Sequence, residues 1–250
     1  MHILAIIGSP RKQGNTAQVV AAVEQALIKN PGVTVEYLYL ADTYLGSCIG
    51  CHVCIFKDEA KCPLHDDRDM ILEKMKQADG LIFAAPVYVF QVPALVKNLI
   101  DHLAFVCHRP VFFSKYAMVI TTTGGGGEKI VNKYMQQILS VWGYHIGSTL
   151  SLQTPPTEPI EQHINKNQQK INDAAQKFYK KLSAGAPTSA KFMSIVLFRI
   201  LRKITFSYPD VFEADVKYYT PLRNSNYFIQ TRVPVMKRGV AWLFEKIVFR

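Results

Sequence analysis

The sequence predicts an α/β fold, a doubly wound parallel sheet of five strands followed by a basic helical extension. Two observations lead to this prediction. Short apolar runs alternate with amphipathic stretches of helical spacing along the first 185 residues. Most of these runs are also unbroken, which is typical of parallel strands that helices cover on both faces. We therefore expect one domain at 1–185 and an extension at 186–250.

The first half of the sheet follows from two kinds of apolar pattern. The run HILAIIG at 2–8 predicts the first strand, and apolar residues at helical spacing predict a helix at 17–30. The run VTVEYLYL at 33–40 alternates and is rich in β-branched and aromatic residues, as in a second strand. A helix at 69–80 then leads to a third strand, GLIFAAPVY at 80–88.

The second half repeats the alternation of helix and strand. A helix is predicted at 92–104, and the strand that follows runs into four glycines at 115–127. Another helix at 130–143 and a short strand at 147–152 complete the sheet. One long polar helix at 161–185, closed by a glycine, ends the domain.

The composition is that of a folded globular chain, with 49% apolar and 19% charged residues among 250. The first apolar run is shorter than the roughly 7 to 15 residues of a signal-peptide core. Arg199, Arg202 and Lys203 interrupt the best candidate for a membrane span, which needs roughly 18 apolar residues. We therefore expect a cytoplasmic protein, in which cysteines stay reduced.

The polar loop GSPRKQGNT at 8–16 has the composition of an anion-binding loop. It places hydroxyl and amide donors, two cations and glycines ahead of a predicted helix, where backbone N–H groups attract an anion. A phosphate monoester fits best, because the loop has neither a GK[ST] ending nor the GxGxxG pattern. An ordinary polar loop is the alternative. The candidate residues are Ser9, Arg11, Lys12, Gly14, Asn15 and Thr16.

Two further loops follow predicted strands and therefore lie at the same edge of the sheet. The loop at 85–93 offers backbone amides, Tyr88 and Gln91 between two stiffening prolines. The loop at 121–129 has hydroxyls and four successive glycines, whose entropic cost indicates close backbone contact with a flat ligand. Together the three loops predict an anion pocket at one end of a site and a planar ring at the other.

The stretches GSPRKQGNT, APVYVFQVPALVKNLIDHL and TTTGGGG resemble motifs of the flavodoxin-like NAD(P)H-dependent FMN reductase family, in family order and spacing. The resemblance covers residues 1 to about 182. It implies a flavodoxin-like fold and FMN, with the phosphate on the first loop. It also implies that the isoalloxazine lies against Pro86, Val87, Tyr88, Gln91, Thr122, Thr123, Gly124 and Gly125.

The implied activity is hydride transfer from NAD(P)H to flavin N5 and on to a small acceptor, such as a quinone, a free flavin or a nitro compound. Because the flavin performs this chemistry, no side chain is expected to act as an acid or base. The alternative is an electron carrier between protein partners. We expect a homodimer or higher homo-oligomer, and no nucleic-acid partner because no recognised binding module surrounds the cations.

Four of the five cysteines lie in one window, CIGCHVCIFKDEAKC at 48–62. The spacing of Cys48, Cys51, Cys54 and Cys62 suits thiolate ligation of a 4Fe-4S cluster, and the segment resembles the cysteine motif of iron-sulfur flavoproteins. The following CPLHDD resembles the stretch that closes this loop in the reductases. Tetrahedral zinc, free thiols and a redox-active pair are alternatives. Cys107 is expected to be a small buried apolar residue.

The last quarter of the chain is basic, with eleven Lys or Arg and four Asp or Glu at 190–250. Two amphipathic segments, 191–206 and 235–250, carry most of these cations. Such helices bind anionic membranes, and Trp242 would add an interfacial aromatic ring. We favour instead that both helices pack on the domain or a dimer partner. The predicted apolar face of the first is Met193, Val196, Leu197, Ile200, Leu201 and Ile204.

Overall fold

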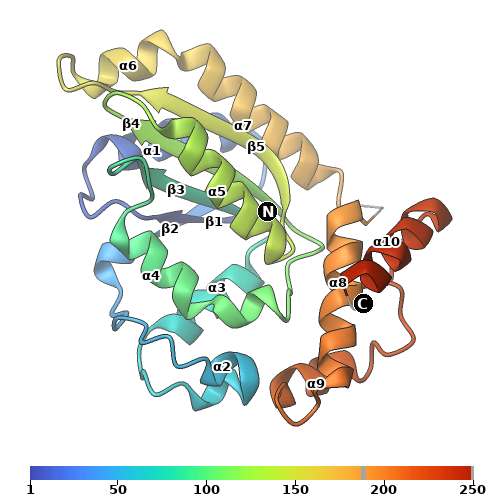
Figure 1. The fold of residues 1–250 in the computed structure, drawn as a ribbon. Coiled ribbons are helices and arrows are strands. Elements are labelled where there is room, and N and C mark those ends of the chain that lie inside the picture. Colours follow the sequence, from blue (N-terminus) through green and yellow to red (C-terminus); the bar gives the residue numbers. More distant parts are fainter. Residues whose placement is uncertain (187–189, 249–250) are drawn as a thin grey trace.

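The computed structural model describes residues 1–186 and 190–248. Its centre is a parallel sheet of five strands in the order β2-β1-β3-β4-β5 (Figure 1). This order is the flavodoxin-like one, which confirms the predicted fold class. The strands are β1 (His2–Ile7), β2 (Thr34–Tyr39), β3 (Gly80–Pro86), β4 (Tyr116–Thr123) and β5 (His145–Gln153).

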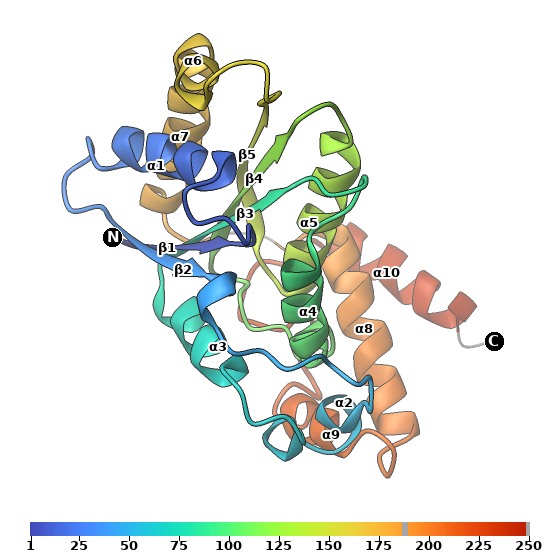
Figure 2. The same cartoon turned by 90° about the vertical axis from the view of Figure 1, so that its left-hand side faces the viewer.

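Helices cover both faces of this sheet, as the unbroken apolar strands predict (Figure 2). Along β1, Ile3, Ala5 and Ile7 face one apolar cluster, and Leu4 and Ile6 face the other. The first cluster is completed by α1 (Asn15–Leu27) and α7 (Gln168–Ser183). The second is completed by α3 (Arg68–Gln77), α4 (Ala94–His102) and α5 (Glu128–Val141).

The single long helix predicted at 161–185 is wrong, because the chain forms two helices there. α6 (Ile160–Lys166) ends at Asn167, which has a φ of −110°, and α7 starts at the next residue. The Asn167 side chain donates to the carbonyl of His163 at 2.8 Å, which is the local bonding by which asparagine competes with a helix. Strand β5 is longer at both ends than the predicted 147–152.

Short helical turns fill the segment between β2 and α3 and the segment after α4. They are η1 (Leu40–Asp42), α2 (Val53–Phe56), η2 (Glu59–Lys61) and η3 (Ala104–Cys107). Cys107 in η3 is half-buried and packs against the second core cluster, so it is less enclosed than expected.

The basic extension contains α8 (Phe192–Ser207), α9 (Glu213–Tyr219) and α10 (Val235–Val248). These helices and Phe113 form a third apolar cluster beside the sheet domain (Figure 1). The predicted apolar face of α8 is partly wrong, since Ile195 and Phe198 are buried whereas Met193 is 69% exposed. The predicted boundary between residues 185 and 186 follows the end of α7 at Ser183, and residues 187–189 are not described.

Within 1–186 and 190–248, none of the helices has the length and apolar character needed to cross a bilayer.

Candidate active site

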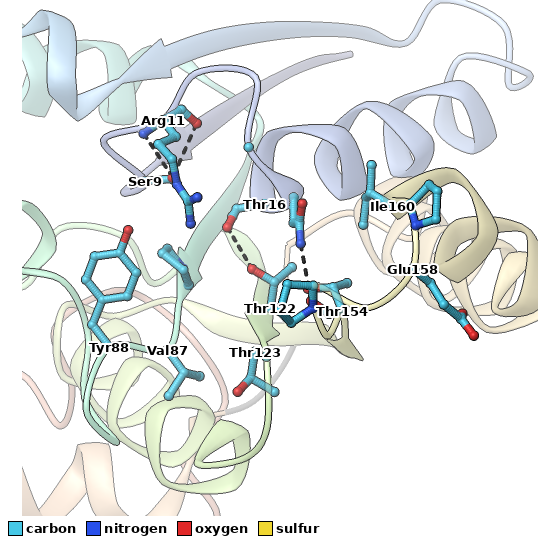
Figure 3. A pocket seen from close by; sticks show the side chains of 16 residues that line it. Ser9, Arg11, Thr16, Val87, Tyr88, Thr122, Thr123, Thr154, Glu158 and Ile160 are labelled. Carbon is cyan, nitrogen blue, oxygen red and sulfur yellow. Dashed lines mark hydrogen bonds between the residues drawn. The ribbon is translucent and has the colours of Figure 1, made fainter.

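A cavity of about 470 Å³ opens at the carboxyl edge of the sheet, between the loops that follow β1, β3, β4 and β5 (Figure 3). This volume is within the range of pockets that hold small molecules and cofactors. Its lining consists of Ser9, Arg11, Gly14, Asn15, Thr16, Pro86, Val87, Tyr88, Thr122, Thr123, Gly124, Thr154, Pro156, Glu158, Pro159 and Ile160.

One end of the cavity is built to receive an anion. The first turn of α1 has no acidic residue and no side-chain cap in the described structure. Its N–H groups and the positive end of the helix dipole are therefore available to an anion in the cavity. The Arg11 guanidinium is directed into the cavity, and Ser9 Oγ accepts from the Arg11 backbone N–H at 3.2 Å (Figure 3). Gly14 turns the chain tightly, since a Cβ there would stand 3.0 Å from the Arg11 carbonyl.

The loops that line the cavity are bonded to one another. The buried hydroxyls of Thr16 and Thr122 share a hydrogen bond of 2.7 Å (Figure 3). Asn15 Nδ2 donates to the Thr154 carbonyl at 3.3 Å, and the Thr154 N–H donates to the Thr123 carbonyl at 2.8 Å. The walls therefore form one connected frame that fixes the shape of the cavity before a ligand arrives.

A strained turn stands beside Tyr88. The N–H of Tyr88 donates to the carbonyl of Gln91 at 2.8 Å, and the reverse bond is 2.9 Å. The two residues between them, Val89 and Phe90, both have positive φ, at 48° and 62°. This conformation is rare for a β-branched residue and costs about 1–3 kcal/mol. Phe90 also packs close to Gly127, where an added Cβ would approach its ring to 3.0 Å.

The structure brings together most, but not all, of the predicted residues. Lys12 points away from the cavity and pairs with Asp42 at 2.5 Å. Gln91 is exposed and forms the turn with Tyr88, while Gly125 donates its N–H to Thr123 Oγ1. Neither of these two residues lines the cavity.

Sequence reasoning missed one wall, the loop after β5. Thr154, Pro156, Glu158, Pro159 and Ile160 come from this loop and the start of α6. Two prolines after a predicted strand were the available signal, because they stiffen a loop at the functional edge of the sheet.

The base of the cysteine loop is held against α4. Asp66 Oδ2 accepts from the N–H of Gly46 at 3.1 Å, and Asp67 Oδ2 accepts from the N–H of Tyr44 at 2.7 Å. His102 Nε2 lies 3.0 Å from Asp66 Oδ2, with both side chains almost fully buried. Asp66 and Asp67 thus hold the end of the loop against its start.

Asn98 of α4 continues this attachment toward the first cysteine. Its Nδ2 donates to the carbonyls of Leu45 and Gly46, at 3.2 and 2.9 Å, and its Oδ1 accepts from the Cys48 N–H at 3.1 Å. The helix that begins beside the cavity therefore also carries the start of the cysteine loop.

The tip of the cysteine loop is held by the basic extension. The buried guanidinium of Arg109 pairs with the buried carboxylate of Asp215 in α9 and donates to the Cys54 carbonyl at 2.5 Å. Glu59 accepts from the same guanidinium at 2.9 Å, and His108 Nδ1 lies 2.8 Å from Asp215.

Contacts at the rim complete this attachment. Lys57 pairs with Glu213, Lys217 pairs with Asp58 at 3.0 Å, and the Phe212 ring meets Phe56 edge-on at 5.5 Å. α2 and α9 accordingly lie side by side in both views (Figure 1, Figure 2).

The four thiols between these two attachments are free. Burial raises the pKa of the Cys54 thiol and the charge of Cys62 raises it further, whereas the Arg68 guanidinium lowers it. Within the described residues, no three His, Cys, Asp or Glu side chains converge as metal ligands. The donor types suit a thiolate-bound metal group, whereas the geometry is that of separate thiols.

The model of the NADPH-dependent FMN reductase family matches residues 1–158 of this chain. An iron-sulfur flavoprotein of Archaeoglobus fulgidus is 31% identical over 183 residues, which are 72% of this chain and 82% of that protein. The chain belongs to the NADPH-dependent FMN reductase family. It is therefore an NAD(P)H-dependent FMN oxidoreductase.

One further relative and one solved structure are also similar to this chain. The FMN-dependent NADH:quinone oxidoreductase 1 of Hahella chejuensis is 28% identical over 167 residues, 57% of this chain and 79% of that protein. The structure of the NAD(P)H:quinone oxidoreductase from Methanothermobacter marburgensis matches with a TM-score of 0.57 at 18% identity. The match covers 72% of this chain and 97% of that one and shows that they share the fold.

We expect Asp215→Asn to destabilise this reductase by about 3–5 kcal/mol, because the buried Arg109 guanidinium loses its buried charge partner and keeps only the more exposed Glu59. The cysteine loop should then be cut faster by a protease, since Arg109 holds the Cys54 carbonyl. Urea unfolding and limited proteolysis measure the two effects.

Asp210→Asn is the matched control, since Asp210 is an exposed acid just before α9 and should change stability by less than about 0.5 kcal/mol. Equal unfolding midpoints and cleavage rates for the two variants would show that the buried pair does not hold the loop.

Proposed function

We propose that this reductase binds FMN in the cavity at the sheet edge, takes hydride from NAD(P)H and reduces a small acceptor, namely a quinone, a free flavin or a nitro compound. The observation that supports the proposal is the polarity of the cavity. An uncapped helix N-terminus and a cation lie at one end, and an aromatic side chain, hydroxyls and a glycine loop lie at the other. Bound flavin supplies a hydride acceptor at N5.

The proposed phosphate site consists of Arg11, Ser9 and the first turn of α1. The guanidinium would supply a positive charge, and the N–H groups at the start of the helix would supply hydrogen-bond donors that orient the phosphate. Ser9 is held by its bonds to the Arg11 backbone, so its hydroxyl has a fixed position. These residues would hold the mononucleotide without taking part in electron transfer.

The proposed ring site lies between Tyr88 and the Thr122 to Gly124 segment. Because the walls are bonded to one another, the ring would be oriented by a preformed frame. The strained turn at Val89 and Phe90 would limit the access of water on the Tyr88 side. An acceptor then has to be flat and small enough to approach the exposed side of the ring.

Anaerobic mixing of the FMN-loaded protein with NADPH or NADH should bleach the visible flavin band, with a rate constant on the order of 1 s⁻¹ or faster. A quinone, free flavin and a nitroarene, added in turn, should restore the band at different rates and so rank the acceptors. Stopped-flow absorbance measures both steps. Protein that is bleached by dithionite and by neither nucleotide would contradict the proposed hydride donor.

Arg11→Ala should raise the FMN dissociation constant about tenfold to a hundredfold, the loss expected for a charge-assisted hydrogen bond of about 1.5–3 kcal/mol. Lys12→Ala is the adjacent control and should change it less than about threefold, since Lys12 is paired with Asp42 instead. Fluorescence titration of the apoprotein with FMN gives both constants. Equal losses in the two variants would reject Arg11 as the specific phosphate ligand.

A second candidate function is electron carriage between protein partners through iron-sulfur in the cysteine loop. It is supported by four free thiols in a loop whose base and tip are both held, and by the name of the Archaeoglobus relative. A 4Fe-4S cluster on Cys48, Cys51, Cys54 and Cys62 would exchange single electrons with the flavin. The loop would have to bring the four thiols together around the metal.

Anaerobic reconstitution with ferrous iron and sulfide should give about four iron atoms per chain and a broad visible absorption. Cys51→Ser should lose most of the iron, whereas Cys107→Ser should retain it because Cys107 lies outside the loop. Iron and zinc assays with electron paramagnetic resonance of the reduced protein distinguish the alternatives. Zinc without iron, or neither metal, would leave the reductase function without a cluster.

A further inference from the structure

The helix α10 has an apolar face that is exposed over residues 235–243, the part of this helix whose side chains the structure describes. Its inner side is fixed by Ala241, which is fully buried, and by Lys237, whose ammonium donates to the Ala190 carbonyl at 3.2 Å. The opposite side consists of apolar residues that are 46% to 84% exposed. They are Val235, Met236, Val240, Trp242 and Leu243.

This arrangement is the reverse of that in α8. In α8, Ile195, Val196 and Phe198 are buried in the third apolar cluster. Over residues 235–243, α10 buries an alanine and exposes Met236 and Leu243, so most of the apolar surface described for this helix stays in water. Apolar side chains gathered in this way mark a surface that is covered by something outside the chain.

The net positive charge of the extension indicates which kind of surface covers this face. Residues 190–250 contain eleven Lys or Arg and four acids. Two of these acids pair with cations of the sheet domain, Asp215 with Arg109 and Glu213 with Lys57, and one of the cations, Lys217, pairs with Asp58. Arg238 is exposed and lies four positions before Trp242, so a cation stands beside the exposed ring on the same side of the helix.

We propose that the exposed face of α10 docks on an anionic lipid surface. The apolar side chains would enter the interface between headgroups and acyl chains, and Arg238 would remain at the anionic headgroups. Trp242 has the amphipathic ring that favours this depth.

A second copy of the chain is a poorer occupant for the same surface. In a two-fold dimer through α10, each protomer would present the same face, so Arg238 of one protomer would be brought near Arg238 of the other, which is unfavourable. An anionic bilayer supplies the opposite charge.

Docking through α10 would leave the flavin cavity in water. The helix lies on the far side of the molecule from the ends of α1 and α6 that border the cavity, in both views (Figure 1, Figure 2). The inferred lipid contact is therefore independent of the proposed acceptor, which reaches the cavity from the opposite side.

Vesicle co-sedimentation of the full-length, FMN-loaded protein tests the proposal. With vesicles of equal parts phosphatidylcholine and phosphatidylglycerol, the protein should pellet, and with phosphatidylcholine alone it should stay in the supernatant. High salt should release it, because screening weakens the attraction of the cations. Met236→Ser combined with Leu243→Ser should lower the binding about tenfold or more.

The matched control is Ile28→Ser combined with Met70→Ser, two exposed apolar residues on α3 and at the end of α1, which should bind like the unmodified protein. Retained flavin absorbance shows that each variant is folded. The proposal fails if the unmodified protein stays in the supernatant with the anionic vesicles, or if it binds both kinds of vesicle equally. It also fails if the α10 variant binds as before, or if that variant only dissociates a dimer that never bound vesicles.

Discussion

The hydrogen bond between Thr16 and Thr122 sets the geometry on which the cavity depends. The two hydroxyls are 106 positions apart in sequence and are buried. Because β3 lies between β1 and β4, the bond spans the end of β3 and draws the first turn of α1 over it. Parallel strands bring the loop after each strand to this edge, and this bond determines how far apart two of these loops stand. The anion end and the ring end of the cavity are consequently fixed relative to each other.

The fold could be predicted because each strand of a parallel sheet covered on both faces is an unbroken apolar run, a pattern that few other kinds of segment require. The strand β1 has buried residues on both faces, and its run of isoleucines could hardly serve an exposed segment. Such arguments weaken where apolar residues are sparse. The polar stretch at 161–185 contains few residues to set a helical phase, and the break at Asn167 depends on one side-chain bond to its own backbone.

The site residues could be predicted where the composition of a loop is unusual. They could not be predicted where the direction of a side chain decides whether it lines the cavity. Glycines, hydroxyls and cations mark three loops, whereas the loop after β5 contributes Pro156 and Ile160, which are ordinary surface residues in sequence. Arg11 and Lys12 are adjacent cations, yet only Arg11 lines the cavity, because Asp42 attracts Lys12 to the other side of the loop. The partners Arg109 and Asp215 are 106 positions apart, and no local pattern connects them.

The two ends of the extension differ in their contacts: α9 packs against the cysteine loop, whereas α10 exposes apolar residues. Burying Asp215 alone would be unfavourable, because its carboxylate loses its hydration. Its pairing with Arg109 and His108 compensates for this loss and so permits α9 to pack against the cysteine loop. Arg109 then bonds to the Cys54 carbonyl, which connects the extension to the backbone between the thiols. At the other end, α10 is held by Lys237 and Ala241 and exposes Met236 and Leu243. Because α8 packs against both α9 and α10, the cysteine loop and the helix that we propose to dock on lipid belong to one packed unit. A surface that orients α10 therefore also orients the thiols, while the flavin cavity at the opposite end stays open.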